Sequence, residues 1–571
     1  MDRQREYEIR NSIADAIKED VERVFEATYE KLGASFINKV LFPITVLELN
    51  YKRKSEESIM AGLEESNELL LLVNPLREAV FWYIKCILSK ERRIKPKLGN
   101  VIIKETEETA FVEFVLQIHD EYKKGEQIRE IRDCSSKVKL VCESENVFSF
   151  YFPKISEIYQ KEMLYYYGMD DSLNTEKERK LFERCEKYLI NKCKMMDMVE
   201  NPGQLFLTYN LLNYMENKID KQYMYLCKKR VMSDLNKIST SSIKSQYKTG
   251  EQLIGSKDEL ATFLALLYYL SRLCMQRYML TSATTIGQEK YYCNYTMPEL
   301  VSLGKQVGLE SDVVKKYVKY FSINPDVKYG NFTEFPLIKL KEMVIWIPSS
   351  IVLNDFQFSI VNGHYYKDII FDNKDETVSQ SIVDYIVNHA KKYSNVIYTE
   401  NYCYSVPGEL YNNKPFNSDI DVAIYEKTNK KLLVIECKWK ENVFQNTENY
   451  VRIEDAFKKI YEGQLEKHEA YLNRTKANIT TLFSNKINFE TEGEIDILYL
   501  FVDKRIQFHD NDKNRHAIPI FMLAYLFEKY GISGNISFEE VFKEIRQMKS
   551  KVEYERIRLK KPVTINEITV V

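Results

Sequence analysis

Apolar residues recur every three to four positions near the start of the chain, from Ile9 to Leu32, and this spacing predicts a long amphipathic helix. A second helical pattern runs from about 155 to 285. It is dense in Tyr, Leu and Met, a composition more typical of a packed core than of a ligand site. Near 100–155 the period shifts toward two, as in Val147–Phe152, which predicts a small β element. We therefore expect residues 1–285 to form a mainly helical region with a β insertion.

The segment 296–321 has the pattern of two short helices joined at Gly308, and it resembles a helix-turn-helix. The run Val344–Ile347 could supply a wing, so residues 290–370 are predicted to form a winged-helix-like linker domain. The second helix carries three lysines: Lys315, Lys316 and Lys319. Such lysines suit phosphate groups, although two-helix hairpins with a lysine face are also common as scaffold.

Residues 372–540 carry helix and strand patterns in the order α-β-β-β-α-β. In chain order these are a helix over 377–393, strands at 396–398, 418–424 and 432–439, a helix over 454–472, and strands at 495–502 and 517–521. Connections of helix length imply that part of the sheet is parallel. The predicted fold is an α/β C-terminal domain with a mixed sheet, appended to a large, mainly α-helical N-terminal region and followed by a basic tail over 541–571.

Charge and composition restrict the classes of partner. The 571 residues include 82 basic and 84 acidic ones, so we expect no general affinity for polyanions, and any nucleic-acid surface must be local. The basic runs Lys90–Lys97 and Lys543–Lys561 could follow a phosphate backbone, although charge runs on helices are usually solvated faces. The apolar stretch Leu260–Leu270 is too short to cross a bilayer, and the charged N-terminus predicts no signal peptide. The ten cysteines include no CxxC pair, which favours reduced thiols in a cytoplasmic protein without a membrane partner.

Two consecutive predicted strands carry ionisable residues where apolar ones are expected. The first strand, Ser418–Ile424, contains Asp421, and the second, Leu432–Trp439, contains Glu436 and Lys438. Because side chains alternate between the two faces of a strand, Glu436 and Lys438 project from the same side, and a turn between the strands brings Asp421 alongside them. Burying three ionisable groups is costly unless they neutralise one another or hold a metal ion. The cluster is therefore predicted to be a functional site rather than a packing accident.

An acid-x-lysine triplet alone is weak evidence in a chain this rich in Glu and Lys. The triplets Glu178–Lys180 and Glu216–Lys218 have the same spacing, but both lie in charged helical patterns with no strand leading into them. Asp496 lies on a predicted strand, yet the residues that follow, Val502–Lys504, lack the acid-x-lysine phase. Asp421 and the triplet 436–438 meet all three criteria: they lie on consecutive predicted strands, the acids have the required separation, and the acid-x-lysine spacing places Glu436 and Lys438 on one face.

In these residues and in the order of its strands, the region 372–530 resembles the PD-(D/E)XK, or restriction-endonuclease-like, nuclease superfamily; the N-terminal two thirds are not covered. The resemblance implies a nuclease, an endonuclease rather than an exonuclease, that depends on Mg²⁺ or Mn²⁺. Hard carboxylate oxygens suit these ions. The implied metal ligands are Asp421, Glu436 and the main-chain carbonyl of Cys437. Lys438 is implied to orient or help deprotonate the attacking water.

Residues on the neighbouring helices are candidates for supporting roles. On the helix predicted over 454–472, Gln464 shares a stripe with His468 and Tyr471. Some branches of the superfamily place a glutamine here, and we include Gln464 among the catalytic candidates, although Gln464–His468 departs from the QxxxY form of those branches. His468 is open between a site role and that of a satisfied structural histidine.

The remaining candidates are left with two interpretations each. Asp419 either supports the site or is a solvated acid at a strand end. Lys440 is expected to contact phosphate rather than to act as a catalyst. The first helix of the superfamily contributes an acid, for which Glu376 and Gln380 compete; Glu376 can simply favour the positive helix N-terminus. The polar turn at 509–512, near His516, matches no standard metal-site spacing.

The sequence thus predicts a Mg²⁺-dependent deoxyribonuclease whose partner is DNA. The resemblance implies a bacterial restriction or anti-phage defence role, which is an analogy of fold. Two alternatives stay open: a catalytically inactive nucleic-acid-binding or regulatory protein on the same fold, and a nuclease that cleaves RNA. The helical region is predicted to recognise the substrate, to gate the nuclease domain, or to bind a protein partner or a second copy of the chain.

Overall fold

The computed structural model forms two compact units. The first comprises Met1–Ala16, Gln127–Leu173 and Lys374–Val571, and the second comprises Ile17–Glu126 and Asn174–Asn373. The residues that the structure describes are 3–32, 41, 44, 77, 79–89, 105–133, 138–155, 176–193, 202–235, 243–245, 255–282, 292–326, 332–352, 354, 356, 359–360, 369–371, 380–438, 458–459, 461–503, 509–510, 514–547, 552–556, 559, 562–565 and 567–571.

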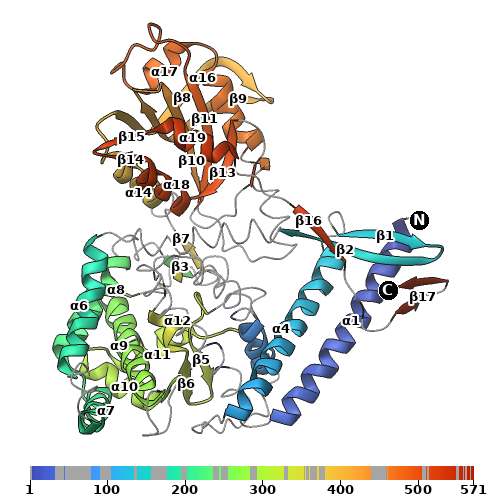
Figure 1. Ribbon diagram of the computed structural model, residues 1–571, viewed down its shortest axis with the longest axis vertical. Coiled ribbons are helices and arrows are strands. Elements are labelled where there is room, and N and C mark those ends of the chain that lie inside the picture. Colours follow the sequence, from blue (N-terminus) through green and yellow to red (C-terminus); the bar gives the residue numbers. More distant parts are fainter. Residues whose placement is uncertain are drawn as a thin grey trace. The chain divides into compact units, whose positions relative to one another are not determined.

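A six-stranded mixed sheet is the centre of the C-terminal part of the first unit (Figure 1). Its strands are β8 (Val396–Tyr411), β9 (Lys414–Glu426), β10 (Lys431–Lys438), β11 (Asp496–Asp503), β12 (His509–Asp510) and β13 (Arg515–Pro519), and their order is β12-β13-β11-β10-β9-β8. The pairs β10 with β11 and β11 with β13 are parallel, whereas the other neighbours are antiparallel. The predicted mixed sheet is confirmed, and the connection from β10 to the parallel strand β11 is of helix length.

Helices cover both faces of this sheet, so its central strands are apolar on both sides. On β10 every residue from Leu432 to Cys437 is buried. One face packs against α16 (Glu466–Leu472) and α17 (Lys476–Leu482), with Leu432 and Val434 in the shared core. The other face packs against α14 (Gln380–Ala390) and α18 (Ile520–Tyr530). Two covered faces explain why the β10 sequence is a nearly continuous hydrophobic run, and why an acid within it is conspicuous.

Several element boundaries differ from those predicted. Strand β8 is far longer than the predicted 396–398, and it continues to Tyr411 through a register irregularity. The predicted strand over 517–521 ends at Pro519, because this residue precedes the first turn of α18. Within the predicted helix 454–472, the described part comprises a π-helical turn, η7 (Tyr461–Leu465), and then α16. Helix α17 was not predicted.

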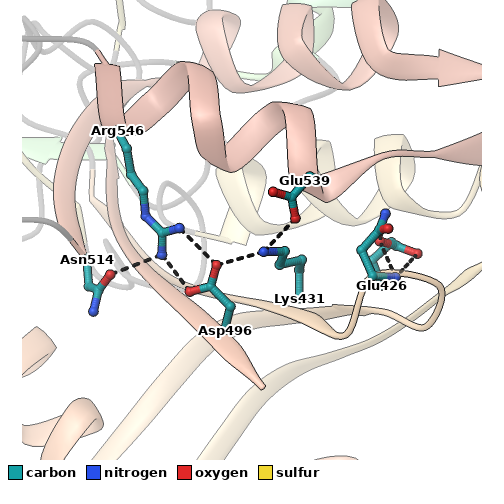
Figure 2. A network of polar contacts seen from close by, with 7 residues as sticks. Glu426, Lys431, Asp496, Asn514, Glu539 and Arg546 are labelled. Atoms are coloured by element: carbon teal, nitrogen blue, oxygen red, sulfur yellow. Dashed lines mark hydrogen bonds and ion pairs between the residues drawn. The ribbon is translucent and has the colours of Figure 1, made fainter. Parts of the chain in front are cut away.

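A network of ion pairs holds the helix α19 (Phe538–Gln547) near the start of β10 and β11 (Figure 2). The guanidinium of Arg546 donates to both carboxylate oxygens of Asp496, at 2.6 and 2.8 Å. The Lys431 ammonium lies 2.9 Å from Asp496 and 2.6 Å from Glu539. The hydrogen bonds from Arg546 hold the pKa of Asp496 below its ordinary value. Arg546 had been predicted to be part of a basic tail, and the structure instead places it in a bidentate structural contact.

A second sheet in the first unit joins distant parts of the sequence. Strands β1 (Lys139–Ser144) and β2 (Val147–Ile155) form a hairpin, and β2 also pairs with β16 (Val552–Arg556) and, in parallel, with β18 (Ile568–Val570); β17 (Val563–Ile565) pairs with β18. The β element predicted near 100–155 therefore begins only at Lys139. Residues 105–133 are a helix, α4 (Glu105–Asp133), so the shift toward a two-residue period was misread there. The segment 541–571, predicted as a basic tail, contains β16, β17, β18 and part of α19.

The second unit is mainly helical, as predicted for most of its sequence. Its helices include α6 (Glu176–Lys192), α7 (Pro202–Asn217), α8 (Lys221–Leu235) and α9 (Lys257–Ser282), and α6, α8 and α9 lie side by side (Figure 1). Helix α9 contains the apolar run 260–270, which is buried on every side, as expected of a core helix. None of the described helices combines the length and the hydropathy that a membrane span requires.

Candidate active site

The hairpin of β9 and β10 brings the predicted acids onto neighbouring strands. The antiparallel register pairs Lys431 with Glu426 and Ile435 with Val422, so the next pair along the ladder is Glu436 with Asp421. The connecting turn is fixed by the Glu426 carboxylate, which accepts from the main-chain N–H of Thr428 at 2.6 Å and of Asn429. This rigid turn sets the register, and the register places the two acids opposite each other.

The side chains of Asp421, Glu436 and Lys438 converge. The Lys438 ammonium forms an ion pair with Glu436 Oε1 and lies 3.9 Å from Asp421 Oδ2. Asp421 Oδ2 also accepts from the main-chain N–H of Cys437 at 2.7 Å. Both acids are shielded, because the side chain of Glu436 is 1% exposed and that of Asp421 is 13% exposed. The three groups that the sequence predicted to meet do meet, with the cation between the two acids.

Glu436 is held by side chains from the following helical segment. Gln464, on η7, donates from Nε2 to Glu436 Oε1 at 2.5 Å. His468, on α16, is completely buried, and its Nε2 lies 3.2 Å from Glu436 Oε2. An ionised carboxylate can only accept, so His468 Nε2 is the donor in this contact. Gln464 therefore reaches the site as predicted, and the structure places His468 in direct contact with Glu436.

A group of tyrosines supports His468 from behind. The hydroxyl of Tyr404, on β8, lies 3.0 Å from His468 Nδ1. The ring of Tyr404 stacks on that of Tyr471, with centroids 3.9 Å apart, and the Tyr471 hydroxyl lies 3.1 Å from that of Tyr402. Sequence reasoning missed Tyr402 and Tyr404 because the predicted strand stopped at residue 398. The available signal was the alternation of tyrosines at 398, 402 and 404, which continues a two-residue period.

Electrostatics divides the acids into two kinds. Burial, and then the negative charge of Glu436, raise the pKa of Asp421 to about 7. Burial also opposes ionisation of Glu436, but the hydrogen bond from His468 and the charge of Lys438 outweigh it, so the pKa of Glu436 lies below its ordinary value. Burial would lower the pKa of Lys438, whereas Glu436 and Asp421 raise it above its ordinary value. The site thus holds one firmly ionised acid, one acid that titrates near neutrality, and a cation.

The other predicted residues lie away from this group or outside the described residues. Asp419 is exposed on β9, and its charge makes a smaller contribution to the raised pKa of Asp421. Gln380 accepts from the Asn401 amide at 3.1 Å and donates to Asp384 at 2.9 Å. Glu376 and Lys440 lie outside the described residues. His509 and Asp510 form the short edge strand β12 rather than part of a turn, and His516 is buried on β13.

The donor set of the site is compatible with a hard divalent cation. Asp421 and Glu436 offer carboxylate oxygens, and such an ion accepts few protein ligands because it retains several waters. The Cys437 thiol is buried and, by strand alternation, lies on the opposite face from Glu436, so only the main chain of Cys437 can contribute. Within the described ranges, no third His, Cys, Asp or Glu joins the two acids in a metal-binding group. The Lys438 ammonium already offsets part of the negative charge of the two acids, which marks this position as one where positive charge is favourable.

The two decoy triplets lie in different surroundings. Glu178 and Lys180 are on α6, and Glu216 is on α7, where it pairs with Arg277. Neither triplet is on a strand.

No protein-family model, curated protein or solved structure matches the chain.

Proposed function

We propose that the first unit contains a metal-dependent deoxyribonuclease site of the PD-(D/E)XK type, which hydrolyses phosphodiester bonds of DNA. The observation that carries the proposal is the convergence of Asp421, Glu436 and Lys438 from two adjacent strands, with the ammonium between the carboxylates. The order α14-β8-β9-β10-η7-α16-α17-β11 supports the same assignment, because it follows the α-β-β-β-α-β order of that superfamily with α17 as an additional helix before β11. A salt-bridged cluster that only stabilises the fold is a poorer explanation, since buried charges cost more than apolar residues of similar size.

Phosphodiester hydrolysis needs an activated water and positive charge near the phosphoryl oxygens. A bound Mg²⁺ or Mn²⁺ would supply both, held by Asp421, Glu436 and the main-chain carbonyl of Cys437. Lys438 has a raised pKa, so it carries a proton at neutral pH. We therefore assign Lys438 to offset negative charge and to orient the water by donating a hydrogen bond, rather than to remove a proton from it.

Glu436 is held in one orientation by the residues that contact it. His468 occupies Oε2, and Gln464 and Lys438 both contact Oε1. We propose that Gln464 and Lys438 share this oxygen so that the carboxylate keeps its position when Lys438 turns toward the substrate. Such preorganisation lowers the cost of arranging the site during the reaction.

The test is cleavage of supercoiled plasmid by the full-length chain with Mg²⁺ or Mn²⁺, compared between the native protein, Lys438→Ala and Lys180→Ala. Lys180 is the matched control because it belongs to a Glu-x-Lys triplet on an exposed helix position. Nicking that is lost in Lys438→Ala and retained in Lys180→Ala is expected. Equal activity of the native chain and Lys438→Ala would overturn the proposal.

Two other outcomes distinguish the rival functions. Absence of cleavage by the native chain with either metal, together with retained binding of DNA, would identify a non-catalytic module. Cleavage of RNA but not of DNA by one preparation would replace the substrate while keeping the site. For the biological role we propose defence against foreign DNA, and the corresponding measurement is phage plating on cells that carry the native chain or Lys438→Ala.

A further inference from the structure

The second unit contains a helix pair flanked by a small sheet. Strand β4 (Cys293–Thr296) leads into α10 (Met297–Gln306) and α11 (Ser311–Phe321), and β5 (Ile338–Leu340) and β6 (Met343–Trp346) follow as a hairpin. The sheet order is β4-β6-β5, so the strand that precedes the helix pair lies against the second strand of the hairpin. With α9 before β4, the order α-β-α-α-β-β is that of a helix-turn-helix with a wing.

The helix pair is tightly fixed. Thr296 and Glu299 form a reciprocal capping box at the start of α10. Gly308 has a φ of +85°, a conformation that few other residues adopt, and it turns the chain between the helices. At Gly304 an added Cβ would lie 2.6 Å from Val314 Cγ2, so the two helices cross at close range. The inner face of α11, with Val314 and Val318, is fully buried, and its outer face is therefore held in one orientation.

The outer face of α11 is basic. Its four exposed positions, 312, 315, 316 and 319, follow helical spacing. Three of them are lysines, and the fourth, Asp312, lies 3.4 Å from Lys315 in an exposed ion pair that contributes little. The neighbouring hairpin exposes two more lysines, Lys339 and Lys341. Glu310, just before α11, and Glu342, at the hairpin turn, are also exposed, so the five lysines still outnumber the three acids.

We propose that the outer face of α11, with Lys315, Lys316 and Lys319, binds the phosphate backbone of duplex DNA. The second helix of such a pair fits the major groove, and the wing contacts the adjacent backbone. Lysine is a point charge on phosphates and can also contact guanine, whereas paired hydrogen bonds to bases come chiefly from Arg, Asn or Gln. The exposed positions of α11 carry none of these three residue types. The face is therefore a positioning surface with weak sequence preference.

The test is equilibrium binding of a fluorescent duplex to the full-length chain in EDTA, followed by anisotropy over a range of salt concentrations. The variant is Lys315→Gln with Lys316→Gln and Lys319→Gln. The matched control is Lys180→Gln with Lys187→Gln and Lys229→Gln, which changes the net charge equally at exposed helix positions of the same unit. Circular dichroism and the melting temperature confirm that both variants fold.

Each phosphate contact contributes about 0.9 to the slope of log affinity against log salt, so the loss of three contacts should reduce the slope by about 2.7. At about 0.1 M salt we expect the α11 variant to bind at least tenfold more weakly than the control variant. Equal binding of the duplex by the two variants would overturn the inference. The same titration with single-stranded RNA gives a second check. If the α11 variant loses binding to RNA but retains binding to duplex DNA, the inference is also overturned.

The outcome is independent of the proposed nuclease site. Binding in EDTA requires no cleavage, so it is measured separately from the plasmid assay. A chain that cuts plasmid while the α11 variant binds normally would retain the nuclease proposal and reject the DNA-binding face. A chain that binds duplex DNA through α11 but does not cut plasmid would retain the DNA-binding face and reject the nuclease proposal.

Discussion

Asp421 is expected to weaken the folded state around β9 as the pH rises, and Asp421→Asn is the substitution that tests this. Burial and the charge of Glu436 raise the pKa of Asp421 from 3.8 to about 7. Because the pKa is higher in the folded state than in the unfolded chain, the stability that the protonated acid confers is fully present below about pH 3.8. It is lost as the pH rises through about 7. An asparagine cannot ionise, and its side-chain oxygen can still accept from the Cys437 N–H.

The magnitude follows from the size of the pKa difference. A rise of about three units, at about 1.4 kcal/mol each, corresponds to about 4 kcal/mol of lost stability at pH 8 in the absence of a divalent cation. Between pH 5 and pH 8 the change is somewhat more than half of this, since part of the loss has already occurred at pH 5. The Asp421 side chain is 13% exposed, so solvent screening reduces these values only modestly.

The assay is hydrogen exchange followed by mass spectrometry, corrected for intrinsic exchange rates, on peptides that cover β9 and β10. It reports local opening and does not require the two units to unfold together. Protection in Asp421→Asn should exceed that of the native chain at pH 8 and approach it at pH 5. Asp419→Asn is the control, because Asp419 is exposed on the same strand and makes only the smaller contribution to the pKa of Asp421, so its difference from the native chain should be much smaller. Parallel pH profiles for the native chain and Asp421→Asn would refute the reasoning.

Three further predictions concern single contacts. His468→Ala should lower the local stability of β10 by about 1–3 kcal/mol, because it leaves a buried oxygen of Glu436 without its donor; exchange of the β10 peptide measures this. Gly308→Ala should cost about 1 kcal/mol, because a Cβ there meets no atom within 4 Å and only the left-handed backbone is strained; thermal unfolding of the full chain measures this. Glu426→Gln should loosen the β9–β10 turn by about 1–2 kcal/mol, since the carboxylate accepts several N–H donors of the turn; unchanged exchange in this turn would contradict the prediction.

The core of the candidate site was predictable because its determinants are local. Strand alternation places Glu436 and Lys438 on one side, and a short turn fixes the register that brings Asp421 opposite. These rules need only about twenty residues of sequence. Gln464 was also predictable, because helical spacing placed it on the inward stripe, and it contacts Glu436.

The remainder depends on contacts between distant parts of the chain. Tyr404 reaches His468 only because β8 continues well beyond its apolar start, and the alternation of tyrosines after 398 is a weak signal among polar residues. The parallel pairing of Val147 with Thr569 joins segments more than four hundred residues apart, and no local pattern encodes it. Helix α4 was missed because its apolar residues lie close to a two-residue spacing at its start. In each case tertiary packing decided between alternatives that the local sequence left open.

Two charged networks in the first unit illustrate why burial matters for assigning function. The network of Lys431, Asp496 and Arg546 is partly exposed and connects α19 to the sheet, so its contribution to the fold accounts for it. Glu436 differs, because it is 1% exposed and lies in a strand that is otherwise apolar. Replacing a buried ion pair with apolar residues of similar volume is often neutral or stabilising, so stability does not explain an acid with three side-chain donors at this position. The arrangement is explained if Glu436 and its partners serve chemistry at this face of the sheet, which is the premise that cleavage by the native chain and by Lys438→Ala tests directly.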